Sequence, residues 1–102
     1  MNYEYLDVVL SPLVTDAREA VATADVGAIA TFPEVWRGRL IVLRTYILVC
    51  LDYASASDDP FSLKLPFYQA QYDTALADAR AALTAANAAT VASLFSIPLE
   101  RA

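Results

Sequence analysis

The sequence predicts an all-α fold, a small bundle of three main helices with a short N-terminal segment and an extended C-terminal tail. Alanine supplies 20 of the 102 residues, and it is the best helix former because ordering it costs no side-chain entropy. Glycine occurs twice, which argues against a turn-rich β protein. Apolar residues recur three and four positions apart over long stretches, the spacing of a helix face. A chain of this length is about one domain.

The first helix is expected over residues 12–24. Ser11 and Pro12 fit a helix N-cap followed by proline at the first helical position. Apolar side chains then recur at helical spacing as far as Ala24 and form one stripe. A connector that contains Gly27 is expected to follow.

The second helix is expected over residues 33–56. Thr31 and Glu34 have the spacing of a capping box, in which each side chain bonds the other's backbone N–H. Two neighbouring apolar stripes follow, and Leu43 and Ile47 lie at the centre of one of them. Together the stripes cover more than half of the helix circumference, whereas a surface helix needs only one. We therefore expect this helix to pack on more than one neighbour, inside the subunit or across an interface.

The third helix is expected over residues 66–86. Asp58 or Asp59 can cap the turn that Pro60 starts, and a hard-cation site is the less favoured interpretation of these two carboxylates. Pro66 is expected to open the helix, because a proline in a helix interior costs about 3 kcal/mol.

After Asn87 the helical period fades, although large apolar residues continue. We therefore divide the chain into a helical bundle domain over 1–87 and a C-terminal tail over 88–102. An apolar tail without a sustained period gains little by folding on itself, so we expect it to dock onto a partner. The alternative is that Val91, Leu94 and Phe95 extend the third helix or fold back over the bundle. The candidate partner-binding residues are Val91, Leu94, Phe95, Ile97 and Leu99.

Three residues are candidates for a subunit interface. Arg39 projects into the apolar arc of the second helix, near the helix end where a positive charge is unfavourable. An acidic group should compensate it, either from the acid-rich residues 1–34 or from a neighbouring subunit. Tyr3 and Tyr5 join Arg39 because tyrosine combines apolar area with a polar tip and favours interfaces.

The residue types provide no recognisable catalytic machinery, so we expect a protein that is not an enzyme and binds no metal or cofactor. Histidine, the commonest general base, does not occur in the sequence. The single cysteine, Cys50, falls within an apolar stripe, where a buried small side chain is expected.

Charge and hydropathy argue against two further classes of partner. The net charge of −5 makes sequence-specific nucleic-acid binding unexpected, because phosphate contacts need clustered Lys and Arg. The longest apolar run, 40–51, is interrupted by Arg44, and a membrane span needs about 20 apolar residues. We therefore expect a soluble protein without a membrane partner.

Several short segments carry a resemblance to a known family. They are Trp36-Arg37-Gly38-Arg39-Leu40, Tyr46-Ile47-Leu48, Asp58-Asp59-Pro60-Phe61, Lys64-Leu65, Tyr68, Tyr72, Ala75-Leu76 and Ala79-Arg80. In this pattern of helices and turns, residues 33–83 resemble the small α-helical head–tail connector proteins (adaptors) of tailed bacteriophages.

The resemblance implies a structural subunit of the virion, made in the host cytoplasm and placed at the head–tail interface. Such adaptors form a ring, usually twelve-fold, that docks on the portal protein and contacts a neighbouring tail or stopper protein. Their C-terminal segment commonly docks onto the portal, and the inner face of the ring lines the DNA channel. The alternative is a small cytosolic helical regulator, an antitoxin or chaperone-like protein that acts by protein–protein binding.

Overall fold

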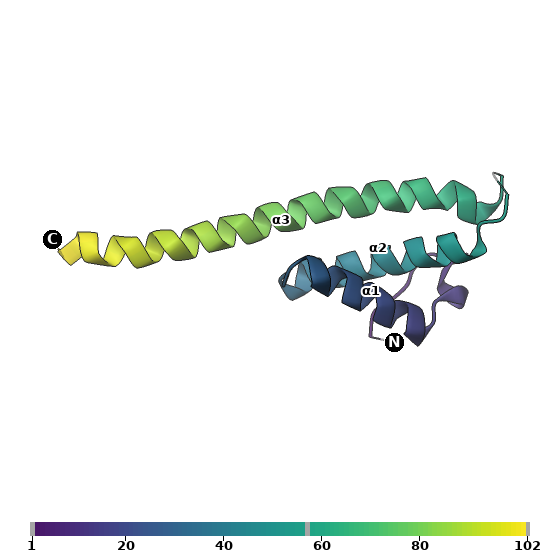
Figure 1. The fold of residues 1–102 in the computed structure, drawn as a ribbon, viewed down its shortest axis with the longest axis horizontal. Helices are drawn as coiled ribbons and strands as arrows, with labels where there is room; N and C mark the ends of the chain where they lie inside the picture. The colour runs from purple at the N-terminus through teal and green to yellow at the C-terminus, as the bar shows by residue number, and fades with distance from the viewer. Residues whose placement is uncertain (1, 57, 102) are drawn as a thin grey trace.

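The computed structural model describes residues 2–56 and 58–101, and describes side chains as far as Ala88. Three α-helices, α1 (Asp16–Ile29), α2 (Glu34–Tyr53) and α3 (Pro60–Arg101), follow a short 3₁₀ helix, η1 (Ser11–Leu13). The chain is 77% helical, and no strand occurs in the described part. The all-α bundle predicted from alanine content and helical spacing is therefore confirmed (Figure 1).

Helix α2 is the centre of the bundle, with α1 packed on one side of it and α3 on the other. Leu43 and Ile47 are 6% and 2% exposed, so their predicted burial is confirmed. Thr45, between them, is also buried, and its hydroxyl donates to the Ile41 carbonyl oxygen at 2.7 Å. The two apolar stripes predicted for α2 thus meet two different helices.

The start of the first helix differs from the prediction. Ser11 and Pro12 open the single turn of η1, and Val14 is extended. Helix α1 begins at Asp16, where the Thr15 hydroxyl oxygen accepts the backbone N–H of Arg18 at 3.2 Å. The predicted N-cap at Ser11 is therefore wrong, because Thr15 binds the free amide of the first turn. The predicted connector around Gly27 is also helical and belongs to α1.

The predicted capping box before α2 is also wrong. The N-cap position is Pro33, and no side chain caps the helix there. The Glu34 carboxylate bonds instead to Nη1 of Arg37 at 2.9 Å and to the Tyr3 hydroxyl at 3.3 Å. An ion pair within the first turn thus replaces the expected reciprocal bonds with Thr31.

Helix α3 begins at Pro60, six residues before the predicted start at Pro66. Asp59 is the cap: its Oδ1 accepts the Ser62 amide at 2.7 Å, and its Oδ2 accepts the Ser55 amide at 2.7 Å. These backbone hydrogen bonds lower the pKa of the Asp59 carboxyl. Pro66 is therefore an interior proline, tolerated because the surrounding turns of α3 pack on the core.

Helix α3 extends well beyond the bundle that it packs against (Figure 1). It has 42 residues against 20 in α2, and the radius of gyration is 18.0 Å, where about 13 Å is usual for a compact chain of this size. Among the side chains that the structure describes, Leu83 is the last of α3 that packs on the core, and residues 84–88 are all exposed. The tail expected over 88–102 leaves the bundle as the continuation of α3 to Arg101.

The N-terminal segment, residues 2–14, is fixed to the bundle by Asp7. Oδ2 of Asp7 accepts hydrogen bonds from two α3 side chains, Nζ of Lys64 at 3.0 Å and the hydroxyl of Tyr68. The backbone N–H of Asp7 donates to the hydroxyl of Tyr46, on α2, at 3.0 Å. One residue therefore joins the segment to both long helices.

The second carboxylate oxygen of Asp7 holds the local turn, because Oδ1 accepts the amides of Val9 and Leu10 at 2.9 and 3.0 Å. The side chain of Asp7 is only 6% exposed. Burial alone would raise its pKa, but the hydrogen bonds from Tyr68, Lys64 and the two amides outweigh burial and lower the pKa to about 2.

The substitution Asp7→Ala should lower the free energy of unfolding by about 2–4 kcal/mol, since it leaves Lys64 and Tyr68 without their acceptor. Asp7→Asn should lose less, because an amide oxygen can still accept the backbone amides. Urea denaturation monitored by circular dichroism would measure both. Asp58→Ala, which removes an exposed carboxylate from the loop before α3, is the matched control; equal losses for the Asp7→Ala and Asp58→Ala variants would contradict the role given to Asp7.

The Asp7 carboxyl should also make stability depend on pH. Its pKa is about 2 in the folded chain and 3.8 as a model value, so its contribution is present above about pH 4 and lost as the pH falls towards 2. The free energy of unfolding should fall by about 2 kcal/mol over that window because of Asp7 alone. Denaturation series at several pH values should show a shallower fall for Asp7→Asn; an identical fall would exclude Asp7 as a cause.

Candidate interaction surfaces

A groove of about 540 Å³ lies where the N-terminal segment crosses α2 and α3. Its walls combine apolar, aromatic and polar side chains from all three segments. The residues that line it include Tyr3, Leu6, Arg39, Val42, Tyr68 and Gln71. Arg39 and Gln71 also border a second, smaller hollow beside Phe67. Leu6 and Phe67 are 76% and 57% exposed, so large apolar side chains flank the groove in open contact with solvent.

Arg39 is exposed, and its guanidinium forms no hydrogen bond or ion pair with any residue that the structure describes. Four other cations each pair with a carboxylate of the same chain. The pairs are Arg18 with Asp52, Arg37 with Glu34, Arg44 with Asp25 and Lys64 with Asp7. Carboxylates from the acid-rich residues 1–34 therefore pair with Arg37 and Arg44. No described carboxylate of the chain pairs with Arg39, for which such a partner was predicted.

Tyr3 lies in the same groove as Arg39. Its ring packs over Gly38, where a Cβ atom would come within 3.1 Å of Cε1 of Tyr3. The Tyr3 hydroxyl donates to the carboxylate of Glu34, and burial raises its pKa. The structure thus brings Tyr3 and Arg39 together, and glycine at position 38 permits the close approach of the ring.

Tyr5 is placed differently, with its hydroxyl turned towards the interior of the chain. The hydroxyl donates to Oε2 of Glu19 at 2.6 Å, and the ring meets the Tyr46 ring edge-on with centroids 5.8 Å apart. Glu19 is 5% exposed, and its Oε1 accepts the Asn2 amide at 2.8 Å. Burial and the Glu19 hydrogen bond raise the pKa of Tyr5. Tyr5 therefore anchors the segment from inside, while Tyr3 faces the groove.

The five candidate docking residues of the tail, Val91, Leu94, Phe95, Ile97 and Leu99, belong to α3. Their side chains lie outside the part of the chain that the structure describes. Their docking role stays a prediction.

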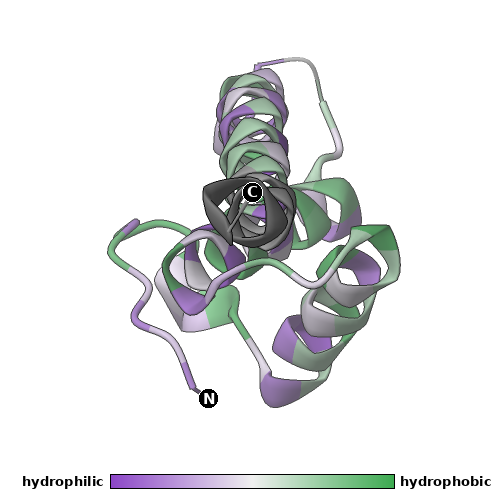
Figure 2. Ribbon diagram, turned by 90° about the vertical axis from the view of Figure 1, so that its left-hand side faces the viewer, coloured by the Kyte–Doolittle hydropathy of each residue, from purple (hydrophilic) through white to green (hydrophobic). Residues whose placement is uncertain are grey.

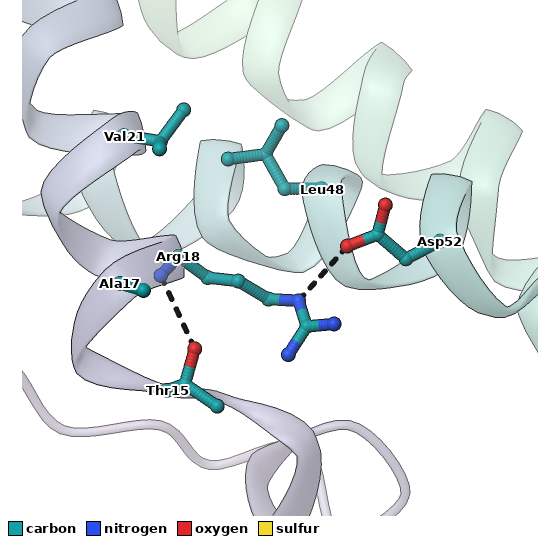
Figure 3. A pocket seen from close by; sticks show the side chains of 6 residues that line it. All are labelled: Thr15, Ala17, Arg18, Val21, Leu48 and Asp52. Atoms are coloured by element: carbon teal, nitrogen blue, oxygen red, sulfur yellow. Dashed lines mark hydrogen bonds and ion pairs between the residues drawn. The ribbon is translucent and has the colours of Figure 1, made fainter.

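Another open hollow, of about 460 Å³, lies between α1 and α2 and is formed around Arg18 (Figure 3). Nε of Arg18 donates to Oδ2 of Asp52 at 3.0 Å, and Nη1 donates to the Leu13 carbonyl oxygen at 3.1 Å. The guanidinium also lies 5.3 Å from the centre of the Tyr53 ring. Sequence reasoning missed this contact, although Arg18 is the one base among residues 1–34. Because its partners lie within the chain, Arg18 is a structural residue.

The described residues offer no arrangement for catalysis or metal binding that we recognise. Cys50 is fully buried, as predicted, and burial raises the pKa of its thiol, which favours the unreactive protonated form. Among the side chains of residues 2–56 and 58–88, no group of three or more Cys, Asp and Glu is placed to hold a metal ion. No described helix is long and apolar enough to span a bilayer. What these surfaces can do chemically is bind carboxylates and apolar side chains.

Comparison with known proteins finds no matching family model, no matching curated protein and no matching solved structure.

Arg39 and Arg18 should respond differently to mutation. Arg39→Ala should change the free energy of unfolding by less than about 0.5 kcal/mol, the usual range for a surface residue without partners. Arg18→Ala should lower it by about 1 kcal/mol, because it removes an ion pair, a hydrogen bond and a contact with the Tyr53 ring. Chemical denaturation of the two variants tests both values, and a loss above 1 kcal/mol for Arg39→Ala would make Arg39 a structural residue.

Proposed function

We propose that this chain is a non-enzymatic structural protein that acts by assembling with other protein chains. The single observation that carries the proposal is the length of α3 relative to its bundle. All five residues from Thr84 to Ala88 are exposed, and together they span more than one full turn of the helix. Isolated helices are only marginally stable in water, and a helix projecting from a small bundle is best explained as a surface that a partner covers.

The groove that contains Arg39, and that Tyr68 and Gln71 also line, supplies a second surface. A closed ring needs two different surfaces on each subunit, since its interfaces are heterologous. The projecting helix and the groove meet that requirement.

We propose further that the assembly is of the phage head–tail adaptor kind: a ring, in the virion, that docks on a portal protein. The support for this finer proposal is the resemblance carried by residues 33–83, together with the two surfaces above. An acidic balance, here a net charge of −5, also suits a channel that DNA must pass without binding. The regulator described above is the competing proposal and needs only one partner surface.

Truncation tests whether the end of α3 is the assembly surface. A chain stopped at Asn87 should keep the melting temperature of the full chain within a few degrees, because the residues just before the cut, 84–87, are exposed. It should fail to join the portal ring that the full chain joins, as measured by native mass spectrometry of the mixture. A sharply lowered melting temperature, or intact assembly, would show that residues 88–102 do not dock.

Phe95→Ala is the matched single substitution, with Asn87→Ala as its control. An aromatic anchor in a partner's pocket commonly contributes 2 kcal/mol or more to binding, so Phe95→Ala should weaken association about thirtyfold or more and leave helicity unchanged. If the full chain does not bind portal rings but forms a stable complex with one other cellular protein, the regulator is favoured instead.

A further inference from the structure

One side of α3 carries a continuous uncharged face, and three of its residues border the hollow that Arg39 of α2 also lines. We call it the outer face and define it by Leu63, Phe67, Ala70, Thr74, Ala77 and Ala81, all of them exposed. They follow one another at alternating steps of four and three, so they lie on one side of the helix with a period of 3.5 residues. In the view along α3, the other helices lie to one side of it (Figure 2).

Leu63 and Phe67 distinguish this face from an ordinary solvated surface, because they are 63% and 57% exposed. Small residues occupy the centre of the face, where they allow another helix to approach closely. A spacing of 3.5 is the repeat with which two helices pack along a shared seam.

The charges beside the outer face point to the occupant. Asp73 and Arg80 lie seven residues apart on one edge, and both are exposed without an ion pair to any described residue. Two turns of helix separate them by about 10 Å, too far for a mutual ion pair. A second copy of α3 running in the opposite direction, centred between positions 73 and 80, would place each Asp73 opposite the other copy's Arg80.

A parallel pairing would be unfavourable by the same reasoning. Asp73 and Asp78 lie on opposite edges of the outer face, five residues apart. In a parallel pair, residues at this spacing on the two edges face each other across the seam, so the two carboxylates would repel. The charges thus favour the antiparallel arrangement.

We infer that two copies of this chain pair through the outer faces of α3, antiparallel and with a two-fold axis next to Ala77. In this pair, Phe67 of one copy lies against the alanine-rich stretch 84–88 of the other. The pair therefore covers residues 84–88, which are exposed in the single chain, and it sets large side chains against small ones.

The inference rests on the proposed function in one respect, that α3 is the helix through which the chain assembles. A two-fold pair closes on itself and does not build a ring. The inferred pair is therefore a state of the chain without its portal partner. Self-association of the chain alone tests the pair, whereas binding to the portal tests the proposed function.

Cross-linking through single introduced cysteines tests pairing and direction together. In the antiparallel pair, Ala77→Cys lies beside its own copy across the two-fold axis and should form a disulfide-linked dimer under mild copper oxidation. Ala70→Cys should not, because its copies are separated by about 20 Å along the helix. Cys50 is buried and does not compete. If both variants cross-link, the pair is parallel. If neither variant cross-links, the chains do not pair through this face. Either result overturns the inference.

Charge reversal provides the second measurement. Asp73→Arg places like charges opposite each other twice in the pair and should weaken dimerisation about tenfold in sedimentation equilibrium. The double variant Asp73→Arg with Arg80→Asp should restore it, while Asp58→Arg, the same change of charge in the loop before α3, should leave it unaltered. A monomeric wild-type chain, or a double variant no better than the single one, contradicts the antiparallel pair.

Discussion

The carboxylate of Asp7 is the interaction on which the arrangement of the three segments depends. It accepts hydrogen bonds from Lys64 and Tyr68 on α3, while the backbone N–H of the same residue donates to Tyr46 on α2. The backbone amides of Val9 and Leu10 donate to Oδ1 of the same carboxylate and so hold the local turn. Because this group lies at the junction of the N-terminal segment, α2 and α3, it also fixes one wall of the groove that contains Arg39. Stability, pH response and the shape of that groove are thus consequences of one buried charge.

The second constraint is the difference in length between the helices. Helix α2 buries side chains against both neighbours, so it fixes the core, but its 20 residues cover only part of the 42-residue α3. Among the described side chains of α3, Leu83 is the last that packs on the core. The exposed residues 84–88 lie after the last described α3 side chain that packs on the core, and we propose that assembly with another chain covers this part of α3.

The sequence predicted those features of the fold that apolar residues at helical spacing can indicate. The spacing around Leu43 and Ile47 predicted a central helix with two packed faces, and the fold class followed from it. Ser11, Thr31 and Pro66 each fit a start signal, but none of them caps or starts the helix that was predicted from it. A cap depends on which oxygen atom lies close enough to a free backbone amide in the folded chain, and a local sequence pattern does not determine this. Contacts such as Asp7 with Tyr68, 61 residues apart, leave no local pattern. Tyr3 and Arg39 were predicted as surface candidates and share one groove, whereas the inward orientation of Tyr5 depends on the buried Glu19.

Residue-level amide hydrogen exchange of the dilute chain tests most directly whether α3 is ordered by its own chain or by assembly. The amides of α2 and of α3 up to Leu83 should be protected to the level of global unfolding, because their helices pack on each other. The amides of residues 84–88 should exchange much faster when the chain is dilute, and slow markedly when the chain is concentrated or given its partner. Uniform protection along α3 in the dilute chain, unchanged by concentration or partner, would contradict the account.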